Sequence, residues 1–220
     1  MSTLLIDLDG TIVRSYPGIR TSFIEAMNHI GHPVPDEDWL HRIPGPPMEE
    51  TMRSLGLPPP DTTSAALKAF RRHYDGGGWR DCELFAGWAE ALPEWKSQGL
   101  RICTATSKSE SLAHKVLSEL GVAQYFDVIA GADATQGRKT KAQVIAHALR
   151  SMNIENTHSD ILMIGDRFHD VEGAREYGIP TALVGWGHGN PSEWETAHFY
   201  ASDMADLKGI VRDFFRPPPP

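Results

Sequence analysis

The chain has 220 residues, of which 40% are hydrophobic and 23% charged, and its net charge is −8. This charge, together with the scatter of the Lys and Arg residues, argues against a nucleic acid or an anionic membrane as a partner. Only two cysteines, Cys82 and Cys103, are present and no apolar stretch has transmembrane length, so we expect a cytoplasmic protein without a disulfide framework.

The first predicted element is a strand that opens the sequence LLIDLDGTIV, residues 4–13. Two carboxylates, Asp7 and Asp9, follow its apolar part with one residue between them, so in an extended chain they point to the same side. Their repulsion costs free energy unless a cation lies between them or one of them holds a proton. An acidic turn with Gly10 at the bend is the alternative explanation.

The next segment, residues 14–80, shows helical patterns and no convincing strand. Apolar residues recur at helical spacing from Ile19 until Gly31 and Pro33 end the helix. Two shorter helices are predicted near 48–55 and 62–74. A segment of this length is far longer than an ordinary connection between a strand and the next strand–helix unit.

We therefore predict a small α-helical cap domain at 14–80, inserted into a core that consists of 1–13 and 81–220. A chain of 220 residues is long enough for a core with such an insertion. The glycines of YDGGGW, residues 76–78, would form the flexible hinge at which the chain returns to the core.

From Phe85 onward, helical and strand-like patterns alternate. Strands are predicted at 100–106, 126–132, 161–166 and 181–186, and helices near 85–99, 109–121, 141–152, 171–178 and 204–214. Ser109 is predicted to cap the second of these helices, and prolines 217–220 to form a frayed tail. Such alternation is typical of a parallel sheet covered on both faces, so the predicted fold class is α/β with a doubly wound, Rossmann-like core.

Carboxylates follow two of the predicted strands. The first strand ends in Asp7 and Asp9, and the strand at 161–166 ends in Asp166, with Asp170 four residues later. Ligands of open parallel sheets bind beyond the carboxyl ends of the strands, so we expect these four side chains at one site. Mg²⁺ takes oxygen ligands, commonly carboxylates and substrate phosphate oxygens, and would offset the repulsion among them.

A third strand end supplies groups that suit an anion. The strand at 100–106 ends in Thr106 and Ser107, shortly before a helix N-terminus whose free N–H groups favour negative charge. Hydroxyls, helix N–H groups and a nearby lysine would together hold a phosphoryl group. The coincidence of three such strand ends makes the simple acidic turn a poor explanation of Asp7 and Asp9.

The order of these motifs resembles that of the haloacid dehalogenase-like hydrolases: DLDGT, then TS in mid-chain, then a lysine, then GDxxxD. The branch that it resembles contains phosphatases of the phosphoglycolate phosphatase type, with a helical cap inserted after the first strand. The resemblance covers almost the whole chain, including TATSK, MIGDRFHD and the final GWGHG. It implies Mg²⁺-dependent hydrolysis of a small phosphorylated metabolite through an aspartyl-phosphate intermediate.

The resemblance also implies a role for each site residue. Asp7 would attack phosphorus, and Asp9 would protonate the leaving oxygen and later deprotonate the attacking water. Family members that cleave carbon–halogen bonds lack an aspartate at the position of Asp9. Thr106 would hydrogen-bond the phosphoryl oxygens, with the Ser107 N–H beside it.

The implied metal site contains the same carboxylates. Asp166 would complete the Mg²⁺ shell together with Asp7 and the backbone carbonyl of Asp9. Asp170 would bind the ion through a water molecule, or would contact the direct ligands without binding the ion itself.

The lysine is ambiguous because GRKTKAQVI offers Lys139 and Lys141, and Lys108 follows the threonine. Lys141 resembles the family position best, since it directly precedes the AQVI helix. It would bind the phosphoryl group and offset its repulsion from Asp7. The alternative, a solvated lysine in a first helical turn, is disfavoured by the helix dipole.

Substrate selection in this family belongs to the cap. The loop IPGPPMEE, around Gly45 to Met48, resembles the cap loop that faces the active site in related phosphatases. Arg14, Arg42 and Arg53 are candidates to meet a second anionic group, although each has the ordinary alternative of a surface arginine.

Two rival functions share these features. A phosphosugar mutase of the same family would carry every motif named above. A phosphoacceptor or binding module resembling bacterial receivers would also cluster aspartates on a doubly wound sheet, but the long insertion and the DxD spacing argue against it. The expected partner is a small phosphorylated metabolite, with no nucleic acid and no membrane, and the expected state is a monomer or a homodimer.

Overall fold

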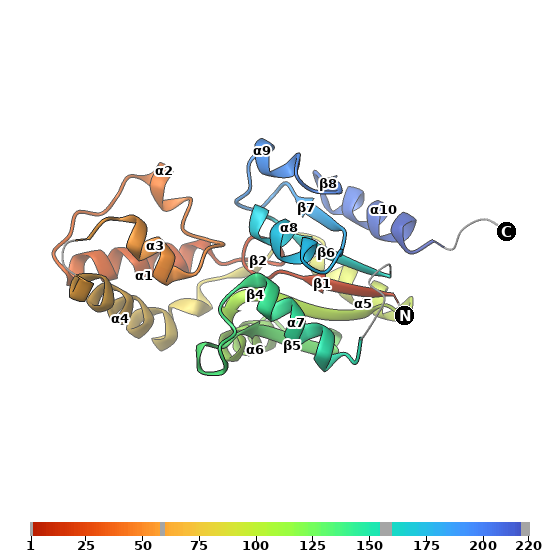
Figure 1. The fold of residues 1–220 in the computed structure, drawn as a ribbon, viewed down its shortest axis with the longest axis horizontal. Coiled ribbons are helices and arrows are strands. Elements are labelled where there is room, and N and C mark those ends of the chain that lie inside the picture. The colour runs from red at the N-terminus through yellow and green to blue at the C-terminus, as the bar shows by residue number, and fades with distance from the viewer. Residues whose placement is uncertain (1, 58–59, 155–159, 217–220) are drawn as a thin grey trace.

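The structure is a computed structural model that describes residues 2–57, 60–154 and 160–216. Figure 1 shows a sheet flanked by helices and a separate group of helices at one end of it. That group is inserted after the first strand and consists of α1 (Tyr16–His29), α2 (Glu37–Leu40), α3 (Met48–Ser54) and α4 (Pro60–Gly76). The predicted fold class, an α/β core with helices inserted after strand one, is confirmed.

The core is a six-stranded parallel sheet in the order β5-β4-β1-β6-β7-β8. Its strands are β1 (Thr3–Ile6), β4 (Arg101–Ser109), β5 (Val128–Ala132), β6 (Ile161–Gly165), β7 (Thr181–Val184) and β8 (Phe199–Ala201). In the central strand, Leu5 lies opposite Cys103 of β4 and Met163 of β6. The chain fills the sheet outward from β1, first to one side and then to the other, and this reversal opens a crevice at the carboxyl end of β1.

Helices cover both faces of the sheet, which explains why the strands are apolar on both sides. Along β1, Leu4 and Ile6 belong to one buried cluster and Leu5 to another. The first cluster includes residues of α5 (Trp88–Ser97), α6 (Glu110–Glu119) and α10 (Met204–Phe214). The second includes residues of α7 (Lys141–Ser151) and, from α8 (Phe168–Arg175), Ala174.

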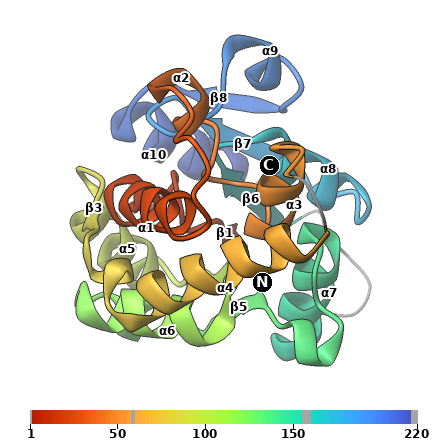
Figure 2. The same cartoon turned by 90° about the vertical axis from the view of Figure 1, so that its left-hand side faces the viewer.

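The four inserted helices form the cap. Helix α1 packs against α4, and Figure 2 shows this group lying in front of the sheet when viewed from its end. Pro17 lies in the first turn of α1, where a proline sacrifices no helical hydrogen bond, and Gly31 with a φ of +65° follows its end. The predicted helices near 19–30, 48–55 and 62–74 are confirmed, while the single turn α2 was not predicted.

The chain passes between cap and core through a two-stranded antiparallel ribbon. Its strands are β2 (Val13–Arg14) and β3 (Glu83–Leu84). The prediction of no strand in 14–80 is therefore wrong at Arg14. Two residues are too few for an alternating pattern, so such a ribbon depends on pairing that only the folded chain provides.

The triplet of glycines, where we predict a flexible hinge, lies at the junction of a helix and a 3₁₀ turn. Gly76 is the last residue of α4, and Gly78 begins a 3₁₀ turn, η1 (Gly78–Arg80). The backbone of α1 packs directly against this turn, because a Cβ at Gly18 would lie 2.1 Å from the carbonyl oxygen of Gly78. Gly18 and Gly78 therefore allow α1 and η1 to approach closely.

Smaller differences concern the ends of elements. Ser109 does not cap α6 with its side chain, because β4 continues to Ser109 with a register shift after Thr106. Strand β8, helix α9 (Pro191–Trp194) and the 3₁₀ turns η2 (Ala123–Tyr125) and η3 (Ala134–Gln136) were not predicted. The tail at 217–220 lies outside the described residues.

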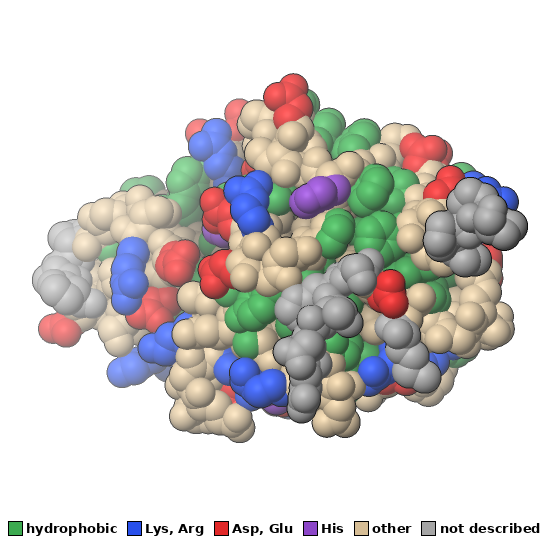
Figure 3. Space-filling view, turned by 45° about the vertical axis from the view of Figure 1, so that its right-hand side comes forward, with side chains coloured by type: hydrophobic (Ala, Val, Ile, Leu, Met, Phe, Trp, Pro, Cys, Tyr) green, Lys and Arg blue, Asp and Glu red, His purple; other side chains and the backbone are tan. Residues whose placement is uncertain are grey.

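Two observations concern the surface and the possibility of a membrane-spanning helix. On the face shown in Figure 3, acidic and basic side chains are interspersed. Among residues whose placement is described, no helix combines the length and apolar character that crossing a bilayer requires.

Candidate active site

The turn after β1 directs two aspartates to different neighbours. Asp7 follows the last residue of β1, and its Oδ1 accepts a hydrogen bond from the Leu8 N–H at 2.8 Å. Gly10 then turns the chain with a φ of +81°, a conformation that favours glycine. A Cβ at Gly10 would lie 2.2 Å from Oδ2 of Asp166, so the same glycine also lets the turn approach the end of β6.

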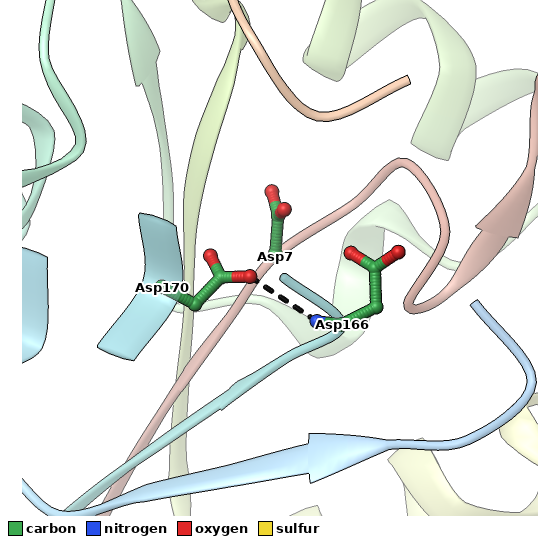
Figure 4. A group of neighbouring side chains, drawn as sticks. All are labelled: Asp7, Asp166 and Asp170. Carbon is green, nitrogen blue, oxygen red and sulfur yellow. Dashed lines mark hydrogen bonds between the residues drawn. The ribbon is translucent and has the colours of Figure 1, made fainter. Parts of the chain in front are cut away.

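Three buried carboxylates meet at this edge of the sheet, as Figure 4 shows. Asp7 comes from the end of β1, Asp166 from the end of β6 and Asp170 from α8. One oxygen from each lies within 4.8 Å of the others, which is the grouping expected of a metal site. The prediction that these strand ends converge is therefore correct for Asp7, Asp166 and Asp170.

Lys141 occupies the space beside this group. Its Nζ lies 3.0 Å from Oδ1 of Asp7, 2.8 Å from Oδ1 of Asp170 and 2.8 Å from the Ala105 carbonyl oxygen. The side chain is only 6% exposed, so this lysine is held inside the protein by its partners. A capping box formed by Thr140 and Gln143 begins α7 and places Lys141 as its first residue.

The two alternative lysines lie elsewhere. Lys139 is exposed, and its N–H donates to the side chain of Gln143. Lys108 contacts Asp9 instead of Asp7. The lysine that pairs with Asp7 in the structure is thus Lys141, as the family resemblance implied.

Burial and neighbouring charges shift the pKa values of the groups in this cluster. Burial raises the pKa of Asp7 to about 6, with Lys141 opposing and Asp170 reinforcing the shift. Burial also raises the pKa of Asp166 well above its usual range, and Asp170 and Asp7 add to the effect. Burial alone would lower the pKa of Lys141, but Asp170 and Asp7 raise it. Clusters of buried groups with perturbed pKa values are typical of functional sites.

These residues fit a hard dication such as Mg²⁺. The donor set consists of carboxylate oxygens, which this ion prefers, and a cation would offset the burial and the repulsion that raise the pKa values of Asp7 and Asp166. Asp170 is already engaged, because its Oδ2 accepts from the N–H groups of Asp166 and Arg167, each at 3.1 Å. The other oxygen of Asp170, Oδ1, lies 2.8 Å from the Nζ of Lys141.

Asp9 does not join this group with its side chain. Its Oδ2 lies 2.9 Å from the Nζ of Lys108, a buried lysine near the end of β4. The Nζ of Lys108 also donates to the hydroxyl of Tyr74 on α4 at 2.6 Å. The Asp9 side chain thus stands outside the group of Asp7, Asp166 and Asp170.

A cavity of about 1000 Å³ lies between Asp7 and Asp9 on the core side and residues of the cap. Asp7, Asp9, Thr106 and Ser107 all line it, so the predicted anion-binding residues share a space with the predicted nucleophile. The Thr106 hydroxyl oxygen accepts a hydrogen bond from the Lys108 N–H at 3.2 Å, which fixes the turn at the end of β4.

The cap supplies the opposite wall. The eight residues of IPGPPMEE, 43–50, all line the cavity, as the resemblance predicted for this loop. Of the three candidate arginines, Arg53 lines the cavity and pairs with Glu49. Arg14 instead pairs with Glu83 in the ribbon, and Arg42 is an exposed residue outside the cavity lining.

Sequence reasoning missed several residues that shape the site. Arg167 donates from Nη1 to the Pro44 carbonyl oxygen at 3.0 Å, which joins the core to the cap loop. The His188 N–H donates to Oδ2 of Asp166 at 2.7 Å, and a Cβ at Gly187 would lie 2.3 Å from the Asp166 Cβ. The available signal was the motif GWGHG, whose glycines permit this close approach.

The fold and the site together define a hydrolase core with carboxylates at the end of a doubly wound parallel sheet and a cap above them. Residues 4–184 match the family described as haloacid dehalogenase-like hydrolase. This chain therefore belongs to the haloacid dehalogenase-like hydrolases.

Individual relatives carry different names. The chain is 43% identical over 186 residues to the tyrosine-protein kinase PtkA of Mycobacterium tuberculosis, covering 84% of this chain and 62% of PtkA. It thus spans less than two thirds of that relative. A 5'-nucleotidase from Pseudomonas aeruginosa is 31% identical over 94% of both chains. A phosphoglycolate phosphatase from Cupriavidus necator is 28% identical over 86% of this chain and 83% of its own length.

Solved structures agree with the fold. A predicted phosphatase from Clostridium acetobutylicum superposes with a TM-score of 0.89 at 29% identity, covering 96% of this chain and 98% of the other. The structure of Mycobacterium tuberculosis PtkA gives a TM-score of 0.82 at 38% identity, covering 96% of this chain and 97% of the other. The shared architecture therefore includes the cap as well as the core.

Proposed function

We propose that this protein is a Mg²⁺-dependent phosphatase that hydrolyses the phosphate ester of a small metabolite through an aspartyl-phosphate intermediate. One observation carries the proposal: Asp7 lies beside Asp166, Asp170 and Lys141 and also lines a cavity that residues of the cap border. The family membership supports it, and the relatives that are named phosphoglycolate phosphatase and 5'-nucleotidase act on phosphate monoesters.

Asp7 is the nucleophile in this proposal. Its Oδ1 is held by the Leu8 N–H and by Lys141, so Oδ2 is the oxygen that forms the bond to phosphorus. The bond from phosphorus to the leaving oxygen breaks, and that oxygen takes a proton from Asp9. Water then attacks phosphorus, Asp9 takes its proton, and Asp7 is released together with inorganic phosphate.

The remaining residues bind and neutralise the phosphoryl group. Thr106 and Ser107 line the cavity beside Asp7. In this proposal they donate hydrogen bonds to the oxygens of the phosphoryl group. The positive charge of Lys141 offsets the repulsion between the Asp7 carboxylate and the incoming phosphate. Asp7, Asp166 and the Asp9 carbonyl would hold Mg²⁺, which would supply electrostatic stabilisation of the charge on the transferring group.

Phosphate release from a panel of phosphorylated metabolites tests the proposal. The panel begins with phosphoglycolate and extends to nucleoside monophosphates and a hexose 1-phosphate, each assayed with Mg²⁺ and with EDTA. We expect Mg²⁺-dependent release of phosphate, and a phosphorylated Asp7 after acid quenching and mass spectrometry. Full activity in metal-free buffer, or isomer formation in place of phosphate release, would contradict the proposal.

A second candidate is transfer of the phosphoryl group to a tyrosine hydroxyl instead of water. The 43% identity to a protein named tyrosine-protein kinase favours it. The two candidates differ in the acceptor, so incubation with a labelled phosphoryl donor and a tyrosine-containing protein separates them. Label on tyrosine would support the kinase, whereas label in free phosphate supports the phosphatase.

A further inference from the structure

A second buried lysine, Lys108, links the cap to the core. It extends from the end of β4, and its side chain is only 4% exposed. On the core side its Nζ lies 2.9 Å from Oδ2 of Asp9. On the cap side the same Nζ donates to the Tyr74 hydroxyl at 2.6 Å and lies 4.8 Å from the centre of the Tyr74 ring.

The burial of this charge makes its partners important. An ammonium group inside a protein is costly unless ion pairs and hydrogen bonds replace its water shell. Asp9 and Tyr74 supply these interactions, and the Tyr74 ring adds a cation–π contact. Tyr74 belongs to α4, two residues before its end, so its contact with Lys108 exists only when the cap lies against the core.

The two oxygens of Asp9 are in different situations. Lys108 holds Oδ2, whereas Oδ1 is buried and receives no hydrogen bond from any residue that the structure describes. A buried carboxylate oxygen without a partner is unfavourable unless a ligand completes it. Asp9 lines the cavity, so Oδ1 is the atom placed to exchange a proton with a bound leaving group.

We propose that Lys108 is a positioning residue that orients Asp9 for proton transfer and that Tyr74 makes this orientation depend on cap closure. When the cap lies against the core, Tyr74 fixes Lys108, and Lys108 fixes Oδ2 of Asp9 with Oδ1 toward the cavity. When the cap moves away, Lys108 loses its cap-side partners and Asp9 loses a fixed orientation. The proposal rests on the proposed phosphatase function for the role of Asp9.

The test compares two substrates that differ in their need for proton transfer. p-Nitrophenyl phosphate has a good leaving group and needs little protonation, whereas glycerol phosphate has a poor one. For Lys108→Met, kcat/KM with glycerol phosphate should fall by about 100-fold, within the range for loss of general acid catalysis, and should fall much less with p-nitrophenyl phosphate. Tyr74→Phe should show the same selective loss at a smaller size, about fivefold, as expected from one lost hydrogen bond.

A double variant tests whether the two residues act in series. If Tyr74 acts only through Lys108, Tyr74→Phe combined with Lys108→Met should lose no more activity than Lys108→Met alone. Lys96→Met and Tyr125→Phe are matched controls, because Lys96 and Tyr125 precede β4 and β5 and lie away from the carboxyl ends of the strands. Both controls should retain the wild-type ratio between the two substrates.

Amide hydrogen exchange supplies a measurement independent of activity. Loss of the Tyr74 hydroxyl should speed exchange about fivefold in residues 70–80, where α4 meets η1. Unchanged exchange, equal losses on both substrates, or additive losses in the double variant would each overturn the inference while leaving the phosphatase intact. A wild-type protein that hydrolyses neither substrate with Mg²⁺ would instead overturn the proposed function on which it rests.

Discussion

At the scale of single residues, the site depends on charges that are buried together. Asp7, Asp166 and Asp170 lie within 4.8 Å of one another, with Lys141 as the cation beside Asp7 and Asp170. This arrangement has a net negative charge in a dry environment, which favours either protonation or a bound cation. The same residues therefore determine both the metal affinity and the reactivity of the site.

Replacing Asp7 by asparagine should abolish turnover with little change in fold. An amide does not attack phosphorus and is a poor ligand for Mg²⁺, so we expect a loss of about 10³-fold or more in kcat. Asp38→Asn, an exposed aspartate of the cap helix α2, is the matched control and should retain full activity. Phosphate release and thermal melting measure the two effects, and more than a few per cent of residual activity would refute the assignment.

The affinity for Mg²⁺ should fall as the pH is lowered through about 6. Burial raises the pKa of Asp7 to about 6, so below this pH the metal-free carboxyl group holds a proton that the ion must displace. For one displaced proton, affinity should fall by about tenfold per pH unit below that value. Isothermal titration calorimetry in buffers with different ionisation enthalpies would show proton release, and pH-independent affinity would contradict the shift.

At the scale of elements, close backbone contact packs the first cap helix against the segment that returns the chain to the core. Helix α1 meets the turn η1 at Gly18 and Gly78. Ser22 reinforces the contact, since its hydroxyl donates to the Gly18 carbonyl oxygen at 2.7 Å and lies 2.9 Å from the His73 ring nitrogen Nδ1. The return of the chain from cap to core is thus a packed junction.

Two glycine substitutions should have opposite effects on stability. In Gly18→Ala the new Cβ would lie 2.1 Å from the Gly78 carbonyl oxygen, so the backbones must separate, and we expect a loss of about 1–3 kcal/mol. In Gly76→Ala the Cβ would meet nothing within 4 Å, so the variant should be neutral or more stable by up to about 1 kcal/mol. Urea denaturation measures the free energy of unfolding of both variants. Equal values would show that the junction accommodates the added methyl group without loss of stability.

At the scale of the whole molecule, cap and core enclose a cavity between them. The cavity of about 1000 Å³ is lined by carboxylates on the core side and by the loop 43–50 on the cap side. This volume lies at the upper end of the range for small-molecule pockets. Two polar contacts, Lys108 to Tyr74 and Arg167 to Pro44, cross from core to cap around it.

The size of the cavity predicts a preference among phosphate monoesters. A two-carbon leaving group such as that of phosphoglycolate fills a small part of the space, whereas a nucleoside can contact both walls and bury more apolar surface. We therefore expect kcat/KM to be at least about tenfold higher for a nucleoside monophosphate than for phosphoglycolate, the factor produced by about 1.4 kcal/mol of extra binding. Steady-state kinetics on both compounds decides, and a faster phosphoglycolate reaction would mean that the cap closes further around a small substrate.

Local sequence patterns determined most of the core. Apolar runs and helical spacing indicated the strands β1, β4, β5, β6 and β7 and the helices between them, because their signals repeat over several residues. The i, i+2 spacing of Asp7 and Asp9 and the strand-end position of Asp166 located the site for the same reason. Lys141 was favoured over Lys139 because its place directly before the AQVI helix resembles the family position, and the structure shows that it begins α7.

The sequence by itself therefore determined the α/β core, the inserted cap and the family, since these follow from periodicity and from motifs of adjacent residues. Only the tertiary structure decided which groups meet across the chain. Tyr74 and Lys108 are 34 positions apart, and the two-residue strands β2 and β3 are separated by the whole cap. Such contacts have no local period, because their stability comes from pairing and burial that exist only once the cap has folded against the core.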